Sequence, residues 1–230
     1  ITVFMSLYTT RLVLAALGLE DFGIFNVVAG AISMLSFLNV AMTNASQRFM
    51  SFAQGRGDIK TQNSIFNISI RLHFFIAVVI VLFLEILGFF LFDGILIIDQ
   101  TRIEVAKLVY HIMVASTFLT VIGVPYDAVI NAHENMLMVA VLRIIEVALK
   151  LAIALFITLS LLTFDKLLIY SFLMALIYAV LYVIRLIYCH KKYIEVSLDV
   201  SSKVDTSLLK EMGSFAGYTF IGSVSSVVAN

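Results

Sequence analysis

Polar residues recur inside one long apolar segment of this sequence, at spacings that place them on one side of a helix. If the segment is projected as a helix at 100° per residue, four of its polar residues fall within about 60° of one another. They are Asn26, Ser33, Asn44 and Arg48. Asn39 extends the same side. Amides and a guanidinium can hydrogen-bond a sugar or an anion, and in hydrocarbon they must face protein or water. The pattern therefore indicates a binding or transport pathway.

Charged residues lie at comparable depth in the other apolar segments. They are Arg11, Arg71, Glu85, Asp127, Arg143, Glu146, Lys150 and Arg185. Together with Arg48 the cations outnumber the carboxylates, which favours an anionic cargo over a cationic drug. Glu85 lies about 21 Å from Arg71 along one helix, so it needs a partner from another segment or a water-filled cavity. Two simpler interpretations stay open: Glu146 and Lys150 could form a static pair, and arginines near helix ends could reach the membrane surface.

The sequence lacks the motifs of an enzyme. It has no Gly-rich phosphate loop followed by Lys, no H-E-x-x-H pair and no nucleophile elbow. The four histidines lie in different segments and Cys189 is the only cysteine, so no metal site, cofactor or disulfide framework is expected. Lys and Arg balance Asp and Glu at 15 each, which gives no indication of nucleic-acid binding. A non-enzymatic function is predicted.

The elements that carry these residues are predicted to be membrane helices. The 230-residue chain is 62% hydrophobic and 13% charged, whereas soluble domains are about half apolar and about a quarter charged. A membrane span needs about 20 mostly apolar residues. The predicted fold class is all-α, a polytopic membrane helical bundle with six transmembrane helices and the start of a seventh. The predicted spans are residues 1–17, 22–53, 64–92, 107–132, 137–161 and 166–188, and the seventh begins at 208.

The links between these spans are short and alternate between the two sides of the membrane. The links that carry or adjoin most of the Lys and Arg are 54–63, 132–136 and 189–207, and the others are 18–21, 93–106 and 162–165. By the positive-inside rule the first set is cytoplasmic, and so is the N-terminus. Because apolar runs occupy both chain ends, we expect the sequence to be a piece of a longer protein.

A break is expected within the fourth span. Gly123 and Pro125 lie inside it, and proline removes an i→i−4 hydrogen bond and clashes with the preceding turn. The pair predicts a kink and a candidate hinge, with a purely structural kink as the alternative.

Several short motifs resemble those of one family. They are residues 17–26 (LGLEDFGIFN), 37–39 (FLN), 47–49 (QRF), 55–58 (GRGD), 125–136 (PYDAVINAHENM) and 211–218 (EMGSFAGY). In combination they resemble the bacterial O-antigen and polysaccharide flippases of the multidrug/oligosaccharidyl-lipid/polysaccharide exporter superfamily. The resemblance covers essentially the whole chain.

The resemblance implies two six-helix lobes around a central cavity. Residues 1–188 would form the first lobe, 189–207 a cytoplasmic inter-lobe loop and 208–230 the first helix of the second lobe. It also implies alternating-access transport of an undecaprenyl-diphosphate-linked oligosaccharide, an O-antigen or capsule repeat unit, across the bacterial cytoplasmic (inner) membrane. Implied partners are this lipid-linked oligosaccharide, membrane lipids, a polysaccharide polymerase and glycosyltransferases. The positions that match the family motifs are Arg11, Asn39, Gln47, Arg48, Pro125, Tyr126 and His133.

The residues and the resemblance together define a set of candidate pathway residues. They are Arg11, Asn26, Asn39, Asn44, Gln47, Arg48, Arg71, Glu85, Asp127, Arg143, Glu146 and Lys150. The leading hypothesis is a flippase whose cations attract the diphosphate. One alternative is an ion-coupled small-molecule or drug exporter with Glu85 and Asp127 as coupling carboxylates. Another is a non-transporting membrane scaffold whose polar faces make static interhelical contacts.

Overall fold

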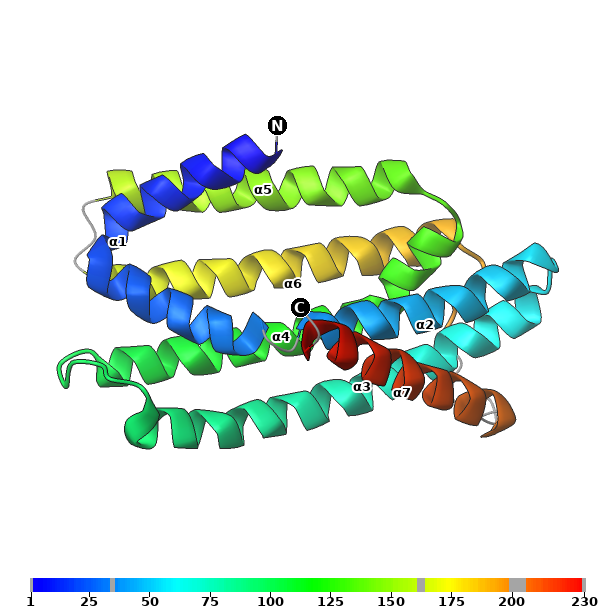
Figure 1. Cartoon of the computed structure of the whole chain (residues 1–230). Coiled ribbons are helices and arrows are strands. Elements are labelled where there is room, and N and C mark those ends of the chain that lie inside the picture. The colour runs from blue at the N-terminus through cyan, green and yellow to red at the C-terminus, as the bar shows by residue number, and fades with distance from the viewer. Residues whose placement is uncertain (1, 34–35, 161–163, 199–205, 229–230) are drawn as a thin grey trace. The chain divides into compact units, whose positions relative to one another are not determined.

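Helices make up all the regular structure in the part of the chain that is described. The computed structural model describes residues 2–33, 36–160, 164–198 and 206–228, and Figure 1 shows the order of its elements. The helices are α1 (Thr2–Ser33), α2 (Ser36–Gly55), α3 (Ile59–Phe90), α4 (Ile103–Ala132), α5 (Met136–Leu159), α6 (Lys166–Lys192) and α7 (Thr206–Val228), with a π-helical turn, η1 (Leu91–Ile95), after α3.

Among the described residues, four stretches are long and apolar enough to cross a membrane. They are residues 3–30, 59–95, 103–132 and 166–192. The helical membrane bundle is therefore confirmed as the fold class, whereas the predicted number of six spans is not confirmed. The reason lies in composition, because α5 carries Arg143, Glu146 and Lys150 and α2 is rich in amides and hydroxyls.

Helix α1 bends sharply at Gly18. The backbone angles there (φ 81°, ψ 173°) are not helical and are accessible to glycine at little cost. The chain reverses direction at this point, so the two arms of α1 run as separate helices (Figure 1), as the predicted link at 18–21 requires. Residues 22–33 and 36–53 of the helix predicted over 22–53 are helical, and residues 34–35 lie outside the described part of the chain, so that their joining in one helix stays a prediction.

Side-chain caps explain where three of the helices begin. Asp58, Asn135 and Asp165 accept hydrogen bonds from backbone N–H groups in the first turns of α3, α5 and α6, at 3.0–3.2 Å. Each such N-cap is worth about 1 kcal/mol to the helix that it begins.

Contacts divide the chain into two units. The first comprises Ile1–Ser33, Val79–Leu119 and Ala140–Leu181, and the second Met34–Val78, Thr120–Val139 and Tyr182–Asn230. The links predicted to be rich in Lys and Arg all fall in the second unit, and the other three fall in the first. The side of the membrane on which each link lies stays a prediction. The predicted lobe boundaries follow a different division and stay a prediction.

In the first unit α1, α5 and α6 pack through an apolar core. Val13, Ala154 and Ile157 are buried there, and the Phe25 ring meets the Tyr170 ring edge to face at a centroid distance of 4.8 Å. Such an aromatic pair adds about 0.5–1.5 kcal/mol beyond the area it buries. The core thus joins segments that are far apart in the sequence.

One arginine connects the three links of the first unit. The Arg102 guanidinium donates to Asp21 Oδ1 from Nη2 at 2.5 Å and to Asp165 Oδ2 from Nη1 at 2.5 Å. Asp21 follows the Gly18 bend, Arg102 lies in the link before α4, and Asp165 precedes α6. Asp165 also caps α6 with its other oxygen, so one carboxylate serves both contacts. We refer to Asp21, Arg102 and Asp165 as the Arg102 clamp.

The clamp shifts the ionisation of its members. Burial alone would raise the pKa of the Asp165 carboxyl, but hydrogen bonds from Arg102 and from the capped backbone outweigh burial and hold the pKa below its ordinary value of 3.8. The hydrogen bond to Asp165 also raises the pKa of the Arg102 guanidinium. The clamp is therefore strongest where both groups are charged.

A glycine allows α3 and α4 to approach closely in the first unit. A Cβ placed on Gly88 would lie 2.5 Å from Tyr110 Cε1. The buried Tyr110 ring is not free to move aside, because its hydroxyl donates to the Leu84 carbonyl at 2.5 Å.

In the second unit α3, α4 and α6 meet around Tyr126. The Tyr126 ring contacts Phe66 and Tyr182 edge to face, at centroid distances of 5.5 Å and 5.9 Å. The buried Cys189 thiol lies 3.8 Å from the Tyr126 carbonyl. Tyr126 is therefore a packing residue of this core. In the same unit α2 and α7 lie side by side (Figure 1).

Replacing the clamp arginine should destabilise the protein in a pH-dependent way. We expect Arg102→Gln to lower the free energy of unfolding by about 1–3 kcal/mol, because it removes charge-assisted hydrogen bonds from partly buried carboxylates. Since the pKa of Asp165 is lowered in the folded state, this contribution is full above about pH 4 and is lost as the pH falls through the folded-state value. The measurement is thermal unfolding in detergent at pH 3 to 7. Lys107→Gln, which loses only a pair with the exposed Glu104, is the control. A pH-independent difference between Arg102→Gln and the unaltered protein would contradict the prediction.

The close contact at Gly88 predicts a steric effect. We expect Gly88→Ala to lower the free energy of unfolding by about 1–3 kcal/mol, because the added methyl group overlaps the fixed Tyr110 ring. Gly23→Ala, where nothing lies within 4 Å of the added Cβ, should be neutral or stabilising by about 0.5–1 kcal/mol. Unfolding temperatures of the two variants test this, and equal values would show that the contact is not constrained.

Candidate substrate-binding site

Helix α2 lies between two pockets of the second unit. The first, which we call the Arg48 groove, has a volume of about 550 Å³ and is lined by Arg48, Phe49, Ser51, Phe52, Glu211 and Phe215. The second, which we call the polar pocket, has a volume of about 720 Å³ and is lined by Gln47, Ser51, Gln54, Gly55, Asn131, Ala132, His133, Glu134 and Met136. Ser51 lines both. Two consecutive residues of α2 thus line different pockets, since Gln47 lines the polar pocket and Arg48 lines the Arg48 groove.

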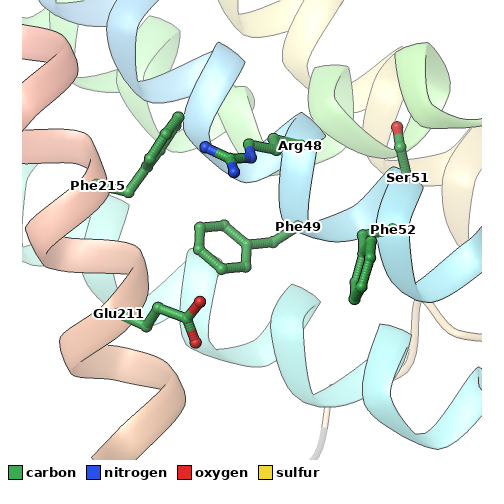
Figure 2. A pocket seen from close by; sticks show the side chains of 6 residues that line it. All are labelled: Arg48, Phe49, Ser51, Phe52, Glu211 and Phe215. Carbon is green, nitrogen blue, oxygen red and sulfur yellow. The ribbon is translucent and has the colours of Figure 1, made fainter.

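The Arg48 groove places a cation among aromatic rings. Figure 2 shows the Arg48 guanidinium turned towards the Phe215 ring of α7, with its central carbon 4.4 Å from the ring centroid. Phe49 contacts Phe215 edge to face at 6.0 Å, and the Glu211 carboxylate lies beyond the Phe49 ring. Stacking occupies one face of the guanidinium and leaves its N–H edge available for an anion. The groove can therefore bind a group that is both anionic and apolar.

The polar pocket is built beside a histidine with two partners. Gln54 Nε2 lies 3.1 Å from His133 Nδ1, and His133 Nε2 lies 2.5 Å from the buried Glu195 carboxylate. The His133 ring also stacks on Tyr193 at a centroid distance of 4.2 Å. Because the links at 133–135 and 193–198 both take part, the network holds two distant parts of the chain against the end of α2.

The segment after α6 is held by side chains of α3. The Asn63 amide donates to the carbonyls of Glu195 and Ser197 at 2.8 Å and 2.9 Å. Asn67, buried one turn later, donates to the Ser197 carbonyl at 3.0 Å. These bonds fix the backbone that carries Glu195, and so they fix the partner of His133.

Four of the charged candidates inside the helices form ion pairs: Glu85, Asp127, Glu146 and Lys150. Glu85 Oε2 lies 2.9 Å from His111 Nδ1, which supplies the partner from another segment that the sequence requires. Asp127 lies 2.7 Å from Arg185 of α6. The remaining pair is within α5, where Lys150 Nζ lies 2.6 Å from Glu146, as the static interpretation predicts. Glu85 and His111 also line a pocket of about 320 Å³ in the first unit.

The other candidates have varied surroundings. Arg11, Asn44 and Arg143 are exposed, Arg71 is half-buried, and the Asn26 amide donates to the Phe22 carbonyl at 2.7 Å. The Asn39 side chain lies outside the described part of the structure. Gly123 and Pro125 are buried within α4, which runs through both of them. The predicted kink and hinge stay a prediction.

The candidate residues are distributed over both units. Arg11, Asn26, Glu85, Arg143, Glu146 and Lys150 belong to the first, and Asn39, Asn44, Gln47, Arg48, Arg71 and Asp127 belong to the second. Gln47 and Arg48 line neighbouring pockets of the second unit, while Glu85 lines a pocket of the first. Convergence of all of them on one cavity stays a prediction.

Two residues of the site are not evident from the sequence. Gln54 is the penultimate residue of α2, next to a turn, and Glu195 lies beyond α6 in a segment without helical periodicity. Two sequence features come closest to indicating these residues. One is the amide-rich end of α2, and the other is His133, which matches the family motif.

No protein-family profile matches this sequence, and no curated protein matches it. A solved structure described as the outward-facing conformation of a multidrug resistance MATE family transporter of the MOP superfamily is similar in fold. The TM-score is 0.80 at 13% identity, over 99% of this chain and 50% of that one. The chain has the fold of about half of that transporter. It spans about half of that protein's length, and at this identity the likeness concerns the fold.

The Asn63 contacts predict a test of the segment after α6. We expect Asn63→Ala to increase the rate of trypsin cleavage at the exposed Lys191 and Lys192 by about five- to tenfold, because the lost hydrogen bonds lower the cost of local opening. Asn44→Ala, which replaces an exposed amide, should leave the rate unchanged. The readout is the time course of fragments in detergent. Equal rates for both variants would show that Asn63 does not hold the segment.

Proposed function

We propose that the chain is part of a membrane transporter that moves a lipid-linked oligosaccharide, an amphiphile with an anionic diphosphate headgroup. The observation that carries the proposal is the Arg48 groove, where an exposed guanidinium lies beside three phenylalanine side chains. A guanidinium binds phosphate oxygens through paired hydrogen bonds, and aromatic rings bind an apolar chain. The similarity in fold to a membrane transporter supports the proposal.

The groove suits the junction between the two halves of such a substrate. A diphosphate cannot enter hydrocarbon without its hydration, whereas a prenyl chain can stay among lipid tails. Arg48 replaces part of that hydration, and Phe49, Phe52 and Phe215 replace lipid beside it. With the predicted orientation, in the bacterial cytoplasmic membrane with the N-terminus inside, the groove lies near the cytoplasmic end of α2. Substrate would then bind from the cytoplasmic leaflet.

The other predicted cations contribute unequally to this function. Lys150 is neutralised by Glu146 at 2.6 Å and faces the Tyr178 ring at 5.8 Å. We therefore expect its substitution to affect transport less than that of Arg48.

A second candidate function is ion-coupled export of a small molecule. It is favoured by the similar structure, which is described as a multidrug resistance transporter. The pair of Glu85 with His111 lines its own pocket and can exchange a proton, as a coupling site requires. In this function the paired carboxylates, rather than the Arg48 groove, drive the cycle.

The proposal is tested by substituting Arg48 in the full-length protein within its own cells. We expect Arg48→Ala to reduce surface polysaccharide about tenfold or more, because a charge-assisted bond to phosphate is lost, and Arg48→Lys to reduce it less. Lys60→Ala, at an exposed position, is the control, and an immunoblot establishes equal protein levels. Normal polysaccharide in both Arg48 variants would contradict the proposal. Increased drug sensitivity with normal polysaccharide, in Glu85→Gln cells, would favour the exporter instead.

A further inference from the structure

We propose that the polar pocket is a subsite for the neutral hydroxyl groups of a saccharide. This inference rests on the proposed function and divides its substrate between two sites, since the Arg48 groove would hold the diphosphate and the start of the lipid chain. The pocket volume of about 720 Å³ is within the range of about 300–1,000 Å³ that small-molecule sites occupy.

The lining of the pocket suits hydroxyl groups better than phosphate. Gln47, Gln54 and Asn131 offer amides that both donate and accept, and Ser51 offers a hydroxyl. Glu134 contributes a carboxylate, which accepts from a hydroxyl and repels a phosphate. No Lys or Arg is among the lining residues that the structure describes. The Arg48 groove also has one carboxylate, Glu211, so the guanidinium of Arg48 is what distinguishes it from the polar pocket as a site for phosphate.

The Gln54 amide is incompletely satisfied in this structure. Its Nε2 lies 3.1 Å from His133 Nδ1, while His133 Nε2 faces the Glu195 carboxylate. This arrangement directs Gln54 Oε1 away from the histidine, where it is buried without a hydrogen-bond partner among the described residues. An unpaired buried acceptor is costly. A small shift of the side chain towards a hydroxyl in the pocket removes that cost, so Gln54 is ready to accept from a sugar.

The position of the pocket also fits a divided substrate. Gln47 and Arg48 are consecutive residues on α2, and Ser51, one turn later, lines both the polar pocket and the Arg48 groove. A saccharide joined directly to a diphosphate can therefore bind with its two parts on neighbouring surfaces of one helix. The His133 network fixes the far wall of the pocket.

The experiment compares two probes in proteoliposomes that contain the full-length protein. One probe is a polyprenyl diphosphate that carries a single N-acetylglucosamine, and the other carries the complete saccharide isolated from the source cells. The transport rate is measured for each over a range of concentrations. A site with several hydroxyl partners favours the probe that fills it. We expect Gln54→Met to lower the ratio of complete-saccharide to one-sugar transport by roughly three- to tenfold.

Further variants separate the subsite from loss of folding and from failure of the proposed function. Asn131→Ala should lower the same ratio, whereas Gln100→Met, the same chemical change at an exposed position, should not. An unchanged ratio in both pocket variants, or an equal loss for the two probes, would overturn the saccharide subsite and leave the proposed function standing. Arg48→Ala should slow both probes. If the unaltered protein moves neither probe, the proposed function falls, and the inference falls with it.

Discussion

A charged side chain inside a membrane bundle loses the hydration that stabilises it in water, so it is stable only beside a partner or at a wet surface. The helices of this chain are arranged in accord with that constraint. Glu85 contacts His111 from the next helix, and Asp127 contacts Arg185 of α6. Where no helix supplies the partner, a link does, as in the Arg102 clamp. Packing of apolar side chains alone would leave the register between these segments undefined. Each pair fixes that register at one point.

The pairing also separates structural charges from charges that can serve a ligand. Glu146 and Lys150 satisfy each other one turn apart, so their positions near the middle of α5 do not by themselves indicate a pathway. Arg48 differs, because its guanidinium stacks on the Phe215 ring and the residue is exposed. An arginine held in this way is preorganised for an anion. The binding chemistry therefore concentrates on α2, where cationic and neutral polar groups occupy neighbouring positions.

The predictions from sequence succeed where one segment contains the whole signal. Apolar runs identify the helices to within a few residues, and the distribution of Lys and Arg separates the links into the two sets that the contact units also separate. Whether 22–53 forms one helix stays a prediction, because residues 34–35 lie outside the described part of the chain. The requirement for a partner of Glu85 is also readable, but the identity of that partner is not, since His111 is a neighbour only after α3 and α4 have packed.

The sequence alone determined that this chain is a helical membrane bundle, and it predicts where the polar faces lie and that the links alternate between the two sides of the membrane. Those properties follow from hydropathy and helical period, which are local. Only the tertiary structure decided that Arg102 joins three links, that His133 contacts both Gln54 and Glu195, and that Arg48 faces Phe215. Such contacts join residues up to more than 160 positions apart in the chain. They depend on how helices cross, which no single segment encodes.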